Sequence, residues 1–130
     1  MAGPISFSVH DGRVCIAKLP SSTRIESLTE TPGFFSVTCT GDELSIVAGE
    51  EFVHPAAKIE RGWRALKVKG PLEFQQKGVL ASLLNPLNEA GISVFALSTY
   101  TTDYVFVLDY HLDKAVQVLQ AAGHQLLPKD

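Results

Sequence analysis

The chain has 130 residues, of which 45% are hydrophobic and 19% are charged, and its formal net charge is −3. This is the composition of one ordinary globular domain or of two very small ones. Acidic and basic residues are mixed without a basic stripe, so no nucleic-acid partner is expected, because phosphate binding needs clustered Lys and Arg. Apolar runs end well short of the roughly 20 residues that span a bilayer, so no membrane association is expected either.

The N-terminal part is predicted to begin with a β-hairpin. Residues 4–10 and 13–19 alternate in polarity on either side of Asp11-Gly12, which is a strong hairpin signal. Residues 20–33 are rich in Ser, Thr and Glu and could hold one short helix. This region is therefore expected to contain two strands and little helix.

A second hairpin is predicted further along the chain. Residues 34–40 and 43–48 are strand-like and are separated by a turn at Gly41-Asp42. Residues 53–60 are expected to form a short helix or a loop. Residues 62–68 alternate in polarity and are predicted to form a strand.

The C-terminal part is predicted to contain two helices. Residues 73–90 carry apolar side chains at helical spacing, although Pro86 should kink or divide this helix. Gly91 fits a helix stop. The elements that follow are two strands, a second helix and a final strand, at residues 92–97, 104–108, 112–122 and 124–127.

This order of elements predicts an α+β fold with a repeat. From Trp63 to Leu127 it is β-α-β-β-α-β, the ferredoxin-like pattern of an antiparallel sheet with two helices on one face. Residues 38–47 and 98–107 both read as a hydroxyl residue, a polar turn, an acid and an apolar strand, which indicates a duplicated unit. The predicted units are residues 1–61, with shortened helices, and residues 62–130.

The two cysteines and the N-terminus favour a cytoplasmic protein. Cys15 and Cys39 both lie in apolar strand patterns and are expected to be buried free thiols. A disulfide would need an oxidising compartment. The first residues lack the basic start and long apolar core of a secretory signal.

Several stretches together form a specific pattern. They are residues 43–47, 62–68, 78–81, 86–87, 90–93 and 98–104. On these stretches the chain resembles the small proteins built from two fused ACT domains, the group of the arginine-sensing CASTOR proteins. The resemblance covers about residues 13–123. It implies two ferredoxin-like ACT units in tandem and a stand-alone regulatory protein that binds an amino acid or similar metabolite between them.

The resemblance also implies a ligand site. It assigns the ligand to a helix start, to the following hairpin turn and to a facing unit. The matching positions are Glu73, Gln76, Lys77, Val79, Thr99, Tyr100 and Asp103, with Ser45 and Ile46 from the facing unit. Backbone N–H groups at a helix start can bind a carboxylate, and Asp103 is an acid for the ammonium group.

Simpler interpretations of these residues stay open. Asp103 could be a turn acid that bonds its own backbone. Glu73 and Gln76 could be solvated residues at a helix start, and Ser45 could be a packed hydroxyl. Lys77 would repel a cationic ligand such as arginine, or it would pair with an acidic ligand or with Glu73.

No enzyme, metal or cofactor signature is found. The four histidines are scattered without metal-ligand spacing, and neither a nucleophile elbow nor a Gly-rich phosphate loop occurs. We therefore expect no catalytic residue. Two alternatives to a ligand sensor stay open, namely a ligand-free dimerisation module that uses open sheet edges and a regulatory subunit of an amino-acid metabolic enzyme.

Overall fold

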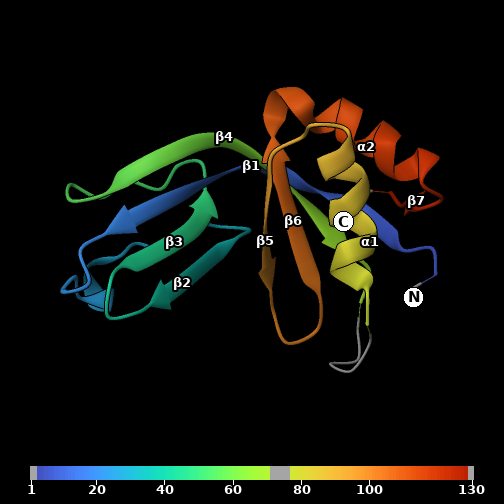
Figure 1. Cartoon of the computed structure of the whole chain (residues 1–130). Coiled ribbons are helices and arrows are strands. Elements are labelled where there is room, and N and C mark those ends of the chain that lie inside the picture. The colour runs from blue at the N-terminus through green and yellow to red at the C-terminus, as the bar shows by residue number, and fades with distance from the viewer. Residues whose placement is uncertain (1–2, 71–76, 129–130) are drawn as a thin grey trace. The chain divides into compact units, whose positions relative to one another are not determined.

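The structure is a computed structural model that describes residues 3–70 and 77–128 (Figure 1). The chain forms two compact units. Unit 1 consists of Met1–Asp11 and Arg64–Asp130, and unit 2 consists of Gly12–Trp63. Unit 2 is therefore inserted into the sequence of unit 1. The units predicted from the sequence are instead residues 1–61 and residues 62–130.

The long first strand explains this difference. The predicted hairpin at Asp11-Gly12 is wrong, because β1 is one strand that spans Ser6–Leu19. Its first residues pair in parallel with β7 (Gln125–Leu126), and its residues after Gly12 pair with another strand, β3 (Leu44–Gly49). Pairing at both ends keeps the chain extended. Gly12 takes a left-handed φ of 84°, which glycine adopts without steric cost.

Unit 2 is built mainly of strands. β2 (Phe35–Cys39) and β3 (Leu44–Gly49) form the predicted antiparallel hairpin, and β3 also pairs with β1. The predicted short helix is a 3-10 turn at Ile25–Ser27, and β4 (Lys58–Val68) begins earlier than expected. The core of this unit contains alternate side chains of β1 and β3, together with Phe52 from the segment after β3: Cys15, Ala17, Leu19, Leu44, Ile46, Ala48 and Phe52.

The two cysteines differ from the expectation in one respect. Both are free thiols, and Cys15 is buried as predicted, with its Sγ 3.5 Å from the carbonyl oxygen of Gly49. Cys39 is exposed because it is the last residue of β2, where the strand leaves the core.

Unit 1 contains the predicted β-α-β-β-α-β series. After β4 come α1 (Val79–Glu89), β5 (Val94–Ser98), β6 (Asp103–Leu108), a 3-10 turn (Asp109–His111), α2 (Leu112–Ala121) and β7. The strand order in this unit is β7-β1-β4-β6-β5, so the N-terminal strand lies between β4 and the final strand. The helices α1 and α2 pack together against one face of the strands (Figure 1). The fold is thus α+β with few helices.

The helix α1 begins later than predicted. Gly78 precedes it with a φ of 79°, and Pro86 lies inside it. Its buried side chains, Val79, Leu83 and Leu87, recur at helical spacing and face the core. Within the described residues, no helix is long and apolar enough to cross a membrane.

Candidate functional site

The turn between β5 and β6 contains three of the predicted ligand residues. Ser98 pairs with Asp103 in the antiparallel register, and the Thr99 N–H donates to the Thr102 carbonyl at 2.9 Å. Tyr100 stands at the tip of this turn with 80% of its surface exposed. The turn is therefore tight, and it presents an aromatic ring away from the core.

Thr102 fixes this turn to the end of the neighbouring strand. Its side chain is buried, and its Oγ1 donates to the carbonyl oxygen of Val68 at 2.6 Å. Val68 is the last residue of β4, so the bond joins the turn to the point where the chain leaves for α1. The sequence did not single out Thr102, because nothing local distinguishes it from the exposed Thr101.

Among the described residues, one carboxylate oxygen of Asp103 accepts a side-chain hydrogen bond and the other does not. The Ser98 Oγ donates to Asp103 Oδ1 at 2.5 Å, across the hairpin. The acid is therefore a turn acid bonded to a neighbouring hydroxyl rather than to its own backbone. Its other oxygen, Oδ2, has no hydrogen-bond donor among the residues that the structure describes, so it is available to a cation.

The start of α1 has hydrogen-bond donors without acceptors in the described part of the chain. Gly78 provides no side-chain cap, and the first turn of the helix contains no acid. Within the described part of the chain, the N–H groups of Val79, Leu80 and Ala81 have no acceptor. The four N-terminal N–H groups of a helix lack intrahelical partners and favour negative charge. Lys77, which is exposed, adds positive charge just before this helix.

The turn and the helix start lie at the same end of unit 1 (Figure 1). The Thr102–Val68 bond connects the turn to the strand that leads into α1. This end therefore combines Lys77 and the first N–H groups of α1, which lack an acceptor among the described residues, with the carboxylate of Asp103. The Val79 side chain is 4% exposed and belongs to the core, so this residue can meet a ligand only through its backbone. Glu73 and Gln76 lie outside the described residues.

The two predicted residues from unit 2 occupy opposite faces of β3. The Ile46 side chain is fully buried in the core of unit 2. Ser45 is half-buried on the other face, where it lines a hollow of about 330 Å³ together with the charged residues Lys18, Glu43 and Lys58. Of this pair, Ser45 has the accessible side chain.

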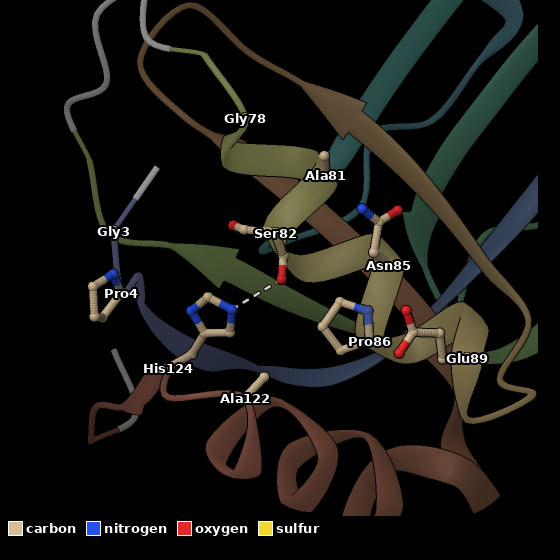
Figure 2. A pocket seen from close by; sticks show the side chains of 10 residues that line it. All are labelled: Gly3, Pro4, Gly78, Ala81, Ser82, Asn85, Pro86, Glu89, Ala122 and His124. Carbon is tan, nitrogen blue, oxygen red and sulfur yellow. Dashed lines mark hydrogen bonds between the residues drawn. The ribbon is translucent and has the colours of Figure 1, made fainter. Parts of the chain in front are cut away.

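A larger hollow of about 560 Å³ lies in unit 1, along the outer side of α1 (Figure 2). Its walls come from α1, from the N-terminal segment and from the chain after α2. His124 lies at its edge and is 8% exposed. Its Nδ1 accepts the N–H of Ile5 at 3.0 Å, and its Nε2 lies 2.9 Å from the carbonyl oxygen of Ser82. This network assigns a neutral ring with the proton on Nε2.

The described residues contain no cluster suited to a metal ion. No group of three or more His, Cys, Asp or Glu side chains in residues 3–70 and 77–128 could hold one.

Two family models match the chain. The ACT domain model matches residues 58–121, and a model of an N-terminal domain matches residues 12–55. The second match lies inside unit 2.

Relatives of known name are about one-third identical to the chain over the aligned residues. The human protein CASTOR3P is 31% identical over 119 residues, which are 85% of this chain and 71% of that protein. The bovine "cytosolic arginine sensor for mTORC1 subunit 1" is 32% identical over 108 residues, which are 78% of this chain. The chain spans 32% of the length of that bovine sensor.

Solved structures show the same fold. A crystal structure of an Agobacterium tumefaciens protein has a TM-score of 0.89 and 34% identity, and the match covers 99% of this chain and 96% of that chain. The regulatory subunit of aspartate kinase from Thermus thermophilus has a TM-score of 0.61 at 10% identity, with 89% and 95% covered. This second similarity concerns the fold alone.

Proposed function

The chain belongs to the ACT-domain family of the CASTOR proteins, and from this membership we propose that it is a regulatory sensor that binds an amino acid. The bovine relative is named as an arginine sensor, and the Thermus thermophilus structure is named as a regulatory subunit. We infer a regulatory rather than a catalytic role for this chain as well. The bovine relative is named cytosolic, and we propose the same compartment here.

One observation supports this function most strongly. The end of unit 1 combines N–H groups at the start of α1 with Oδ2 of Asp103, and none of these groups has a hydrogen-bond partner among the residues that the structure describes. A free amino acid carries a carboxylate and an ammonium group, and a site that takes both out of water must supply a partner for each. The N–H groups would receive the carboxylate, and Asp103 would receive the ammonium group.

The charge at this end also bears on the ligand's side chain. Lys77 is exposed immediately before α1. A second cation repels a guanidinium or an additional ammonium group. A neutral or acidic amino acid is therefore favoured over arginine or lysine. The resemblance also assigns a facing ACT unit to the ligand, with Ser45 as its polar contact, and Ser45→Ala tests this part of the proposal.

The test is thermal unfolding of the full chain in the presence of each of the twenty amino acids at millimolar concentration. A ligand at about 100 times its dissociation constant stabilises by roughly 2.7 kcal/mol, which raises the Tm of a chain of this size by several degrees. Asp103→Ala should abolish this shift while leaving a folded protein. Asp42→Ala is the matched control, because Asp42 occupies the turn of the β2–β3 hairpin.

A second candidate function is a ligand-free dimerisation module. The strand β5 contains no charged residue and no proline, and in the described residues it pairs only with β6. Unpaired strand edges of this kind invite pairing with another chain. A stable dimer by analytical ultracentrifugation, without a Tm shift from any amino acid, would favour this alternative. Recovery of one metabolic enzyme with the tagged chain would instead favour a regulatory subunit.

A further inference from the structure

We propose that the hollow along α1 is a second ligand site and that it binds a small organic cation with an apolar body. The hollow has a volume of about 560 Å³, which lies within the usual range of small-molecule pockets. It belongs to unit 1. Gly78 and Ala81 at the start of α1 line it, but the β5–β6 turn does not, and Glu89, on which the proposal rests, lies at the other end of the helix. The proposal therefore does not depend on the amino-acid site described above.

The charge of the hollow is the first argument. Among the described residues that line it, Glu89 alone carries a formal charge. Both ring nitrogens of His124 are engaged, Nδ1 with the N–H of Ile5 and Nε2 with the carbonyl oxygen of Ser82. Glu89 makes no ion pair within the described residues, and Lys114, on α2, donates its Nζ to the carbonyl oxygen of Ala90 instead.

Glu89 also lies at the negative end of the α1 helix dipole. It is the last residue of α1, and no basic residue occupies the last turn of this helix. The C-terminus of a helix carries a partial negative charge, which an acid at that position increases. Lys114 already donates to the Ala90 carbonyl at this C-terminus, so the ammonium or guanidinium group of a ligand would pair with the Glu89 carboxylate.

The walls of the hollow indicate that the rest of the ligand is apolar. Pro4, Ala81, Pro86 and Ala122 provide an apolar lining, and Figure 2 shows them around the same space as the polar groups. The exposed Asn85 lies one helical turn before Glu89 and has no hydrogen-bond partner among the described residues. The amide and the carboxylate can therefore both accept from one cationic group while its carbon skeleton covers the apolar wall.

The test is calorimetric titration of the full chain with three probes that share one ring: cyclohexylammonium, cyclohexanol and cyclohexanecarboxylate. We expect saturable binding of the ammonium compound, at least about tenfold weaker binding of the alcohol and none of the carboxylate, because a charge-assisted hydrogen bond contributes this much. Equal binding of ammonium and alcohol would overturn the proposal, since the hollow would then be a merely apolar groove.

Four variants locate the binding, two of them in the hollow and two of them controls elsewhere. Glu89→Gln should weaken ammonium binding by about tenfold, whereas Glu30→Gln, an exposed glutamate in unit 2, should not. Ala81→Leu fills the hollow from an exposed helix position and should abolish binding without affecting the core. Asp103→Ala should leave this binding intact. Unchanged binding in Glu89→Gln or Ala81→Leu, or its loss in Asp103→Ala, would show that the cation does not bind here.

Discussion

His124 replaces a backbone donor that Pro86 lacks. In a regular α-helix the carbonyl oxygen of Ser82 would accept the N–H of residue 86, but proline has none. The structure places the His124 Nε2 at 2.9 Å from that oxygen, and Figure 2 shows this bond. The same ring accepts the N–H of Ile5 through Nδ1. One nearly buried side chain thus satisfies a helix carbonyl and the amide of the residue just before β1.

We expect His124→Ala to destabilise the protein by about 2–4 kcal/mol. The substitution leaves a donor and an acceptor without partners, and each such buried group costs about 1–3 kcal/mol. In a Pro86→Ala background, the alanine has an N–H that can reach the Ser82 oxygen, so His124→Ala should cost about 1 kcal/mol less there. Urea unfolding of the four proteins in this cycle measures both values.

His54→Ala is the control for this cycle. His54 is half-exposed, and its Nδ1 accepts the N–H of Ala56 in a surface loop. Its removal should cost less than about 1 kcal/mol. If His124→Ala cost the same with and without Pro86, the missing proline N–H would not be what His124 compensates.

A second prediction concerns the bond between Thr102 and Val68. Thr102→Val keeps the shape of the side chain but leaves the Val68 carbonyl without its donor, so we expect a loss of about 1–3 kcal/mol. Thr102→Ser retains the hydroxyl and should cost less. Thr101→Val, at the exposed neighbouring position, should change the free energy of unfolding by less than about 0.5 kcal/mol. Equal effects at positions 101 and 102 would contradict the role of this bond.

The sequence predicted those elements whose signals are local. The β2–β3 hairpin at Gly41-Asp42 is confirmed, because a turn and its two strands are adjacent in the chain. The same type of signal at Asp11-Gly12 failed, because β1 pairs with β7, more than a hundred residues away. At Asp11-Gly12, the long-range pairing of β1 with β7 therefore determines that the chain forms a continuous strand rather than a turn.

The same contrast between local and long-range signals applies to the residues of the candidate site. The hairpin residues Thr99, Tyr100 and Asp103 are found together at one end of unit 1 because they belong to one turn. Thr102 and His124 could not be recognised, since their partners lie 34 to 119 residues away in sequence. Ile46 was assigned to the ligand, yet its side chain is in the core, because neighbouring residues of a strand face opposite sides.

A third prediction concerns the two thiols. Cys39 is exposed and Cys15 is buried, so a thiol reagent should label Cys39 rapidly and Cys15 only when the protein unfolds. Labelling followed by mass spectrometry in native buffer and in denaturant distinguishes the two. Rapid labelling of both cysteines in the native protein would show that the core of unit 2 opens readily.

The burial of Cys15 also makes the free energy of unfolding depend on pH in the alkaline range. Burial raises the pKa of the Cys15 thiol above its usual value of 9.0, and the positive charge of Arg61 opposes this only in part. Between the unfolded and folded pKa values the native state holds the proton more tightly, so stability falls as pH rises above about 9. Cys15→Ala should lose this part of the pH dependence in urea unfolding. An unchanged slope in that variant would exclude Cys15 as its source.

The last prediction tests the backbone of β1. Gly12 has a φ of 84°, so an alanine there should cost about 1–2 kcal/mol even though its Cβ would meet no atom within 4 Å. Gly41→Ala is the matched control, since its φ is not positive and its surroundings are equally open. It should be neutral or slightly stabilising, because alanine restricts the unfolded chain. Equal stabilities of the two variants in urea unfolding would mean that residue 12 does not need the left-handed conformation.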